Sequence, residues 1–261
     1  MVSMKKLPGL IFILLFLPLS AFAAQVCDGT GDGWTIDNPD VGSTSYTVGC
    51  WIYDAATAED GNVMNYGVGN ARGFNWYEYT GGYSYLINMQ AAAYSGSSNN
   101  AWGEGAWHNV IWTSSGGTIK MYIDATDGTA DFTSSATDAV AQNSTDDFKI
   151  GLTQASDIWG GNIELSAKLE HCFYANTVLD ESEITAIANK STCPTDIATH
   201  SANIKIFLPL TTGLAVTDES SNHFTVTESG NPTDDAGPGS MPTCGGAAAD
   251  NLPILQAIGE D

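Results

Sequence analysis

Basic residues are scarce in this chain, and their scarcity limits the partners that it can have. The 261 residues include eight Lys and Arg against 30 Asp and Glu, which gives a formal net charge of −22 at pH 7. A surface of this charge repels nucleic acid and anionic lipid, both of which are bound through basic patches. We therefore expect no nucleic-acid partner, and we interpret the acidity as favouring solubility or calcium binding.

Long apolar runs are also missing, apart from one at the N-terminus. "LIFILLFLPL" follows Lys5 and Lys6, and "SAFAAQ" then supplies small residues for cleavage after Ala23 or Ala24. This pattern predicts a bacterial-type signal peptide over residues 1–24. We expect a secreted, extracellular protein with no transmembrane segment. Cleavage removes two lysines and no acids, so the net charge becomes −24.

Helical periodicity is nearly absent, whereas alternation with a period of two recurs between Gly-, Ser- and Asn-rich turns. "GFNWYEY" and "YSYLINM" predict a hairpin, and further strands are expected in "YTVGCWIY", "WHNVIWT", "TIKMYID", "DFKIGL" and "NIELSAKLEHCFY". One short helix is predicted near residues 181–189, because Asp180 and Glu183 form a capping pair before it. The fold class is therefore an all-β antiparallel sandwich.

The five cysteines favour disulfides, since the chain is predicted to be exported. Cys172 and Cys193 bracket a strand, a turn and the helix, and Cys27 and Cys244 lie where a bond would tie the chain ends together. We expect these two bridges and a free Cys50, although spacing alone does not fix the connectivity.

Three segments in order resemble the laminin-G-like, concanavalin A-like jelly-roll family. "YTVGCWIY" is similar to the family's "FTVSAWV" strand, and "GAWHNVIWTSSGGTIKMYIDATDG" resembles its Trp-His hairpin. "IWGGNIELSAKLEHCFYANTVLDESEI" is similar to the family's closing segment. The resemblance covers roughly Ser45 to Lys190 and implies a jelly roll. It also implies that Trp51 and Trp107 pack the sandwich.

One stretch departs from the family order. "FLPLTTGLAVTDESSNHFTV", from Phe207 to Val226, resembles an opening strand of the family but follows the helix here. It is too short for a core of its own. We expect one domain over residues 25–244, with strands around 203–228 closing the same sandwich. A flexible or docking tail is expected over 245–261.

The motifs of common hydrolases are missing. No strand carries the paired glutamates that retaining glycosidases hold about 5–5.5 Å apart, and neither a GxSxG elbow nor an HExxH helix is present. Glu164, Lys168 and Glu170 alternate as expected for a solvated edge, and His171 is interpreted as a core histidine. We expect no catalytic residues and no enzyme.

Two loops are candidates for calcium, although no cofactor is required. "DGTGDG" places Asp28 and Asp32 like the first half of a calcium loop, but Pro39 stands where the bidentate acid is expected. "DATDG" supplies Asp124 and Asp127. Ordinary turn chemistry is the alternative interpretation of both loops.

A carbohydrate site is predicted around the hairpin "NWYEYTGGYSY", because aromatic rings stack on sugars and neighbouring polar groups bind hydroxyls. The candidate ligand residues are Trp76, Tyr79, Tyr83 and Tyr94. One face of this hairpin must be core, so only some of these rings can be free.

Three functions follow from these observations. The first is a secreted, non-catalytic binding or adhesion module for a glycan or a cell-surface or matrix component. The second is a structural subunit of an extracellular assembly that associates with itself, favoured by the odd cysteine and the apolar tail. The third is a glycoside-active enzyme, which no motif supports.

Overall fold

The structure is a computed structural model of the chain, and the N-terminal segment and several short internal ones are outside its described part. The described residues are 23–54, 61–68, 72–79, 83–90, 93–100, 105–139, 141–153, 164–211, 215–239, 241–242 and 244. Most of the predicted signal peptide and all of the predicted tail over 245–261 therefore lie outside the described residues.

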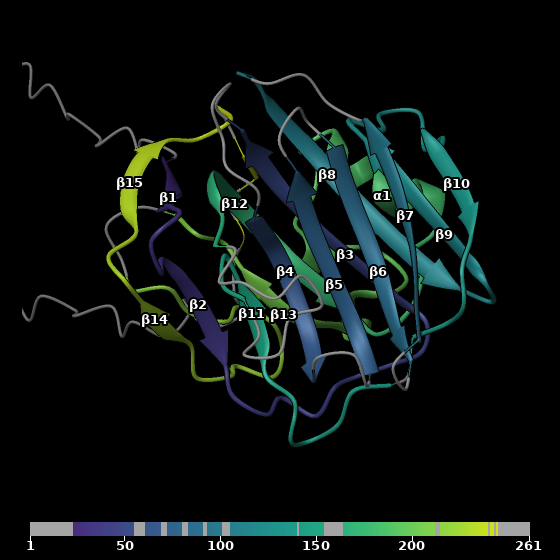
Figure 1. Ribbon diagram of the computed structural model, residues 1–261. Helices are drawn as coiled ribbons and strands as arrows, with labels where there is room; N and C mark the ends of the chain where they lie inside the picture. Colours follow the sequence, from purple (N-terminus) through teal and green to yellow (C-terminus); the bar gives the residue numbers. More distant parts are fainter. Residues whose placement is uncertain are drawn as a thin grey trace, which may run out of the picture.

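Two antiparallel sheets face each other and form the predicted sandwich (Figure 1). We call the first sheet A, in which β12 pairs with β3 on one side and with β1 and then β13 on the other. Its strands, in spatial order, are β10 (Phe132–Ser135), β9 (Thr118–Ile123), β8 (Trp107–Ser115), β3 (Tyr46–Tyr53), β12 (Ser166–Ala175), β1 (Ala23–Asp28) and β15 (Thr233–Ala236), with β13 (Ile204–Leu208) beside β12.

Sheet B is the layer nearer the viewer in Figure 1. The predicted hairpin is confirmed as β5 and β6, which pair from Arg72 opposite Gln90 to Tyr79 opposite Tyr83. The strand order is β14 (Thr227–Ser229), β2 (Gly33–Ile36), β11 (Phe148–Ile150), β4 (Gly61–Val68), β5 (Arg72–Tyr79), β6 (Tyr83–Gln90) and β7 (Ala93–Asn100).

The main core lies between the sheets and follows the strand period of two. Alternate residues of β3 and β8, such as Val48, Val110 and Trp112, are fully buried in it. Tyr174 of β12 lies at its centre, where its ring packs against Tyr66 and Phe148 from sheet B. Burying such aromatic side chains supplies much of the hydrophobic stabilisation.

The outer face of sheet A carries a second hydrophobic layer. The predicted helix is confirmed as α1 (Glu181–Ala188), and its Ile184 and Ile187 pack with Ile111 and Phe173 of the sheet. Two short 3-10 turns, Pro194–Asp196 and Ser201–Asn203, follow the helix. Because α1 is only eight residues long, it covers only part of the outer face of sheet A.

The strands after the helix join the two sheets already described. β13 pairs with β12 in sheet A, and β14 pairs with β2 in sheet B. Phe207 of β13 lies within the layer under α1. Within the described part of the chain, no helix is long and apolar enough to span a membrane.

A β-bulge in β12 changes which residues face the core. The register against β3 shifts between Glu170 and Phe173, and His171 takes a positive φ of 51°. Leu169 and Cys172 consequently both face the main core, although regular alternation would place them on opposite faces. His171 is buried, as predicted, but it packs edge-on against Phe207 of the outer layer.

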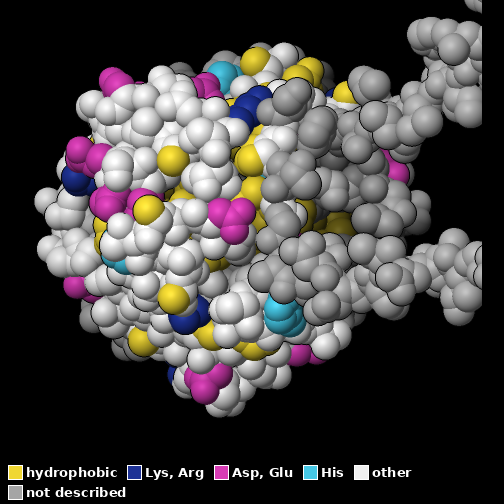
Figure 2. All heavy atoms as spheres, turned by 180° about the vertical axis from the view of Figure 1, so that it is seen from behind, with side chains coloured by type: hydrophobic (Ala, Val, Ile, Leu, Met, Phe, Trp, Pro, Cys, Tyr) yellow, Lys and Arg dark blue, Asp and Glu magenta, His cyan; other side chains and the backbone are white. Residues whose placement is uncertain are grey.

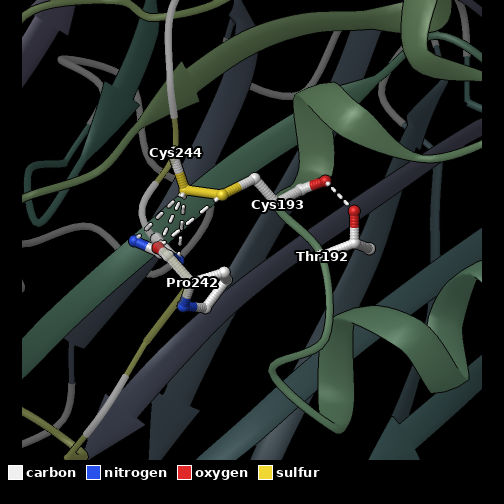
Figure 3. Close-up of a disulfide and its surroundings, with 5 residues drawn as sticks. Thr192, Cys193, Pro242 and Cys244 are labelled. Carbon is white, nitrogen blue, oxygen red and sulfur yellow. Dashed lines mark hydrogen bonds between the residues drawn. A yellow bond between two sulfur atoms is a disulfide. The ribbon is translucent and has the colours of Figure 1, made fainter.

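The bulge explains why the predicted disulfides are wrong. Cys172 bonds to Cys50 on the neighbouring strand β3, with 4.2 Å between the Cα atoms, and Cys193 bonds to Cys244 (Figure 3). Cys27, predicted to pair with Cys244, is instead free and buried in the main core. The partners depend on which strands are neighbours in the sheet, and the spacing of the cysteines along the chain does not reveal this.

We predict that the protein, unfolded without a reductant, exposes one reactive thiol, and that this thiol is Cys27. Burial raises the pKa of the Cys27 thiol far above its usual value, so it should not react in the folded state. Alkylation followed by peptide mapping measures both. Cys27→Ser is the control and should show no label. Label on Cys50 in the unfolded protein would contradict the assigned bonds.

Candidate binding groove

The structure changes the predicted glycan site on the β5–β6 hairpin. Trp76 is fully buried between the sheets, and its indole N–H donates to Ser84 Oγ at 2.8 Å, so it has no face for a sugar. The prediction for Trp76 is wrong, because this face of the hairpin is the core face. Tyr79 and Tyr83 are paired opposite each other and Tyr94 opposite Met89, but the side chains of these three tyrosines lie outside the described residues.

The acids of the predicted calcium loops hold their own turns. Asp28 accepts from the backbone and the hydroxyl of Thr30, and Asp32 accepts from the backbone N–H groups of Asp28 and Asn231. These bonds match the turn interpretation of the first loop. Calcium binding there stays a prediction.

The second calcium loop behaves in the same way. Asp124 accepts from the Asn109 N–H at 2.8 Å and bonds to His108 Nδ1 at 2.6 Å. Asp127 accepts from the Thr129 N–H. Calcium binding at this loop likewise stays a prediction.

A groove that sequence reasoning missed lies on the outer face of sheet A, where α1 begins. Its volume is about 510 Å³, within the usual range of ligand sites. One wall is formed by outward residues of β8 and β9, and the other by the segment that enters α1. The lining residues are Thr113, Ser115, Thr118, Lys120, Tyr122, Val178, Leu179, Asp180, Glu181 and Ser182.

The α1 wall is fixed by a capping box. Asp180 accepts from the Glu183 N–H at 2.9 Å, while Glu183 accepts from the Asp180 N–H at 3.1 Å. Bonds from Ser182 and from the Glu183 backbone lower the pKa of Asp180, so its carboxylate stays ionised. The predicted capping pair is thereby confirmed, and it holds Asp180 at the edge of the groove.

Glu183 also fastens a second segment to this wall. Its carboxylate accepts from the backbone N–H groups of Thr199 and His200 and bonds to His200 Nδ1. Asp180, Glu183 and His200 are the one group of metal-ligating type whose atoms lie close together in the described part of the chain. Since Glu183 is saturated with internal donors, we interpret the group as a structural clasp.

The sheet wall supplies the groove's free polar groups. Within the described residues, the ammonium of Lys120 has neither an ion pair nor a hydrogen bond, in contrast to Arg72 and Lys168. Burial and the charge of Glu181 raise the pKa of the Tyr122 hydroxyl. The groove therefore contains the Lys120 ammonium, several hydroxyl groups and the carboxylates of Asp180 and Glu181.

Glu170 shows that the predicted solvated edge on β12 is partly wrong. Its side chain is fully buried, neither carboxylate oxygen has a partner, and burial raises its pKa to about 8. The charged neighbour that acts on it is Lys190, a cation. Two-carboxylate chemistry needs a second acid, and none acts on Glu170 among the described residues. Glu170 does not line the groove.

The sequence of the chain matches the model of a protein family. The Laminin_G_3 model, described as the concanavalin A-like lectin/glucanases superfamily, matches residues 28–185. The chain belongs to this superfamily. The resemblance drawn from the three sequence segments is confirmed, and the strands β13 to β15 lie beyond the matched region. No curated protein matches the chain by sequence.

Solved structures with the superfamily's fold are similar in shape and distant in sequence. A heptameric SAP-like pentraxin from Limulus polyphemus is 14% identical, with a TM-score of 0.55 over 83% of this chain and 95% of its own. A putative carbohydrate binding protein from Bacteroides ovatus is 14% identical, with a TM-score of 0.57 over 84% of this chain and 61% of its own.

A third structure is a CBM40 domain from Ruminococcus gnavus, bound to α2,3-sialyllactose. It is 14% identical, with a TM-score of 0.50 over 64% of this chain and 95% of its own. At these identities the likeness shows the fold alone.

We predict that Glu170→Gln stabilises the protein increasingly as the pH rises. The folded-state pKa of about 8 lies above the unfolded value, so wild type loses stability as the pH climbs from about 4.5 to 8. Gln carries no charge and escapes this loss. The stability difference should be small and constant in acid and reach about 2–4 kcal/mol at pH 9.

Urea unfolding at pH 5, 7 and 9 measures this difference. Glu164→Gln is the matched control, because Glu164 precedes the same strand and is partly exposed. A stability difference for Glu170→Gln that does not change with pH would contradict a buried, unpartnered carboxylate.

Proposed function

We propose that this protein is a secreted, non-catalytic carbohydrate-binding module whose ligand lies in the groove at the start of α1. The observation that carries the proposal is the lining of the groove. Lys120 and the Thr118 hydroxyl have no partner within the described residues, and they stand across from the acids at the α1 entry.

This set of groups suits sugar hydroxyls. Each hydroxyl both donates and accepts, so it pairs best with a wall that offers an ammonium on one side and carboxylates on the other. The groove is open and not enclosed, which suits part of a chain better than a small molecule. Proteins of the same fold include one described as carbohydrate binding and one bound to sialyllactose.

The electrostatics of the groove favour binding over hydrolysis. A general acid for glycoside cleavage needs a raised pKa, whereas the pKa of Asp180 is lowered by its cap bonds. Among the described residues, the carboxyl group with a strongly raised pKa is that of Glu170, which is not among the lining residues. Two disulfides also suit a chain exported to an oxidising environment.

We predict that Lys120→Ala weakens oligosaccharide binding at least about ten-fold, because a hydrogen bond to a charged donor contributes about 1.5–3 kcal/mol. A glycan array identifies the ligand, and calorimetry measures the affinity. Lys149→Ala is the matched control, since it removes the same charge from β11 in sheet B. Equal binding by the two variants would move the site away from the groove, and silence across neutral and acidic glycans would refute the proposal.

A further inference from the structure

A pair of aromatic rings lies on the outer face of sheet A, at the opposite end from the groove. Trp107 begins β8 and Tyr53 ends β3, and the two residues are directly paired across the strands. Their ring centroids are 5.7 Å apart, and both side chains are partly exposed. Trp107 is therefore outside the main core, so the expectation that it packs the sandwich is wrong.

An ion pair lies beside the Tyr53 ring. Lys168 Nζ lies 4.6 Å from the centre of the Tyr53 ring and forms an ion pair with Asp235 at 2.6 Å. The next residue on β8, His108, alternates to the opposite face of the sheet from Trp107 and is not part of this surface. Two flat rings beside the Lys168–Asp235 ion pair form an amphipathic surface.

The next row of the sheet contains buried polar atoms that nothing satisfies. Glu170, Trp51 and Asn109 stand side by side on β12, β3 and β8. Among the described residues, the Glu170 carboxylate, the Trp51 Nε1 atom and the Asn109 Nδ2 atom have no hydrogen-bond partner, although the three residues are at most 6% exposed. A buried polar group without a partner destabilises the folded state. A fold that served packing alone would gain from apolar residues here.

We propose that Tyr53 and Trp107 form a second carbohydrate contact surface, separate from the groove, that stacks against the apolar face of a pyranose ring. A sugar ring has one relatively apolar face and hydroxyls around its edge. The two aromatic rings would stack on the apolar face, and the flanking polar groups would form hydrogen bonds with the hydroxyls. The Lys168 ammonium and the Asp235 carboxylate are the polar groups beside the stacking rings. The proposal goes beyond the groove and does not depend on it.

The two surfaces are distinct places on one sheet face. Trp107 and Thr113 are six residues apart on β8, which corresponds to about 20 Å along the strand. Between them, Ile111 is covered by α1. Figure 2 views the molecule from this side and shows scattered Asp and Glu side chains with few Lys or Arg between them. One long glycan chain can reach both surfaces, or two short ones can bind independently.

The test uses calorimetry with cellohexaose, xylohexaose, mannohexaose, chitohexaose and 3′-sialyllactose as probes. Trp107→Leu keeps apolar volume against Tyr53 but removes the flat ring, whereas Trp107→Phe keeps a ring. Circular dichroism melts verify folding of each variant. We expect Trp107→Leu to weaken binding at least ten-fold or to remove one site from the stoichiometry, and Trp107→Phe to lose much less.

Comparison with Lys120→Ala separates the two proposals. Loss in Trp107→Leu with unchanged binding in Lys120→Ala would support this surface and refute the groove. Loss in Lys120→Ala alone, with Trp107→Leu binding like wild type, would refute this surface and keep the groove. Equal loss in the Leu and Phe variants, or no binding of any probe by wild type, would also overturn the proposal.

Discussion

The alternation of side chains along β8 and β3 is the constraint on which the molecule depends. The two strands pair without a register shift from Tyr46 opposite Ser114 to Tyr53 opposite Trp107. Trp112 is five positions after Trp107, an odd offset, so an unbroken strand must turn the two side chains to opposite faces. Trp112 accordingly lies in the main core, and Trp107 faces outward. The same strand therefore supplies one tryptophan to the core and one to the outer surface of the sandwich.

The outer face of sheet A is only partly covered, and both candidate binding surfaces lie on its uncovered parts. In the middle, α1 buries an apolar layer. At one end lies the groove with Lys120, and at the other lie the two aromatic rings beside the row of buried polar groups; none of these polar groups has a hydrogen-bond partner in the described part of the chain. A short helix on a long sheet leaves both ends of the face to polar and aromatic side chains. The net charge of the chain adds a bias toward neutral ligands.

The sequence was sufficient for the features that are local or periodic. The sandwich, the β5–β6 hairpin and α1 with its capping box follow from patterns within a few residues of each other. The disulfide partners were missed because they depend on which strands are neighbours and on the bulge at Glu170, which shifts the face of Cys172. A bulge shifts the phase of the alternation, but here an apolar run, Cys172 to Ala175, follows it and hides the shift.

The candidate sites were largely out of reach for a related reason. The groove is formed by β8 and β9 together with a segment about sixty residues later. No local sequence motif predicts that these segments lie side by side. The aromatic composition of the hairpin predicts a ligand site at Trp76, but composition does not show which face of the hairpin is buried. One feature of the sequence does bear on the outer surface. The odd spacing of Trp107 and Trp112 already implies that one of them is outside the core.

Hydroxyl-radical footprinting of the free protein, read out by mass spectrometry at each tryptophan, tests the facial assignment directly. The account predicts that Trp107 oxidises in the folded state, while Trp34, Trp76 and Trp112, all at most 1% exposed, are protected until the protein unfolds. Oxidation of Trp112 or Trp76 as fast as that of Trp107 would contradict it.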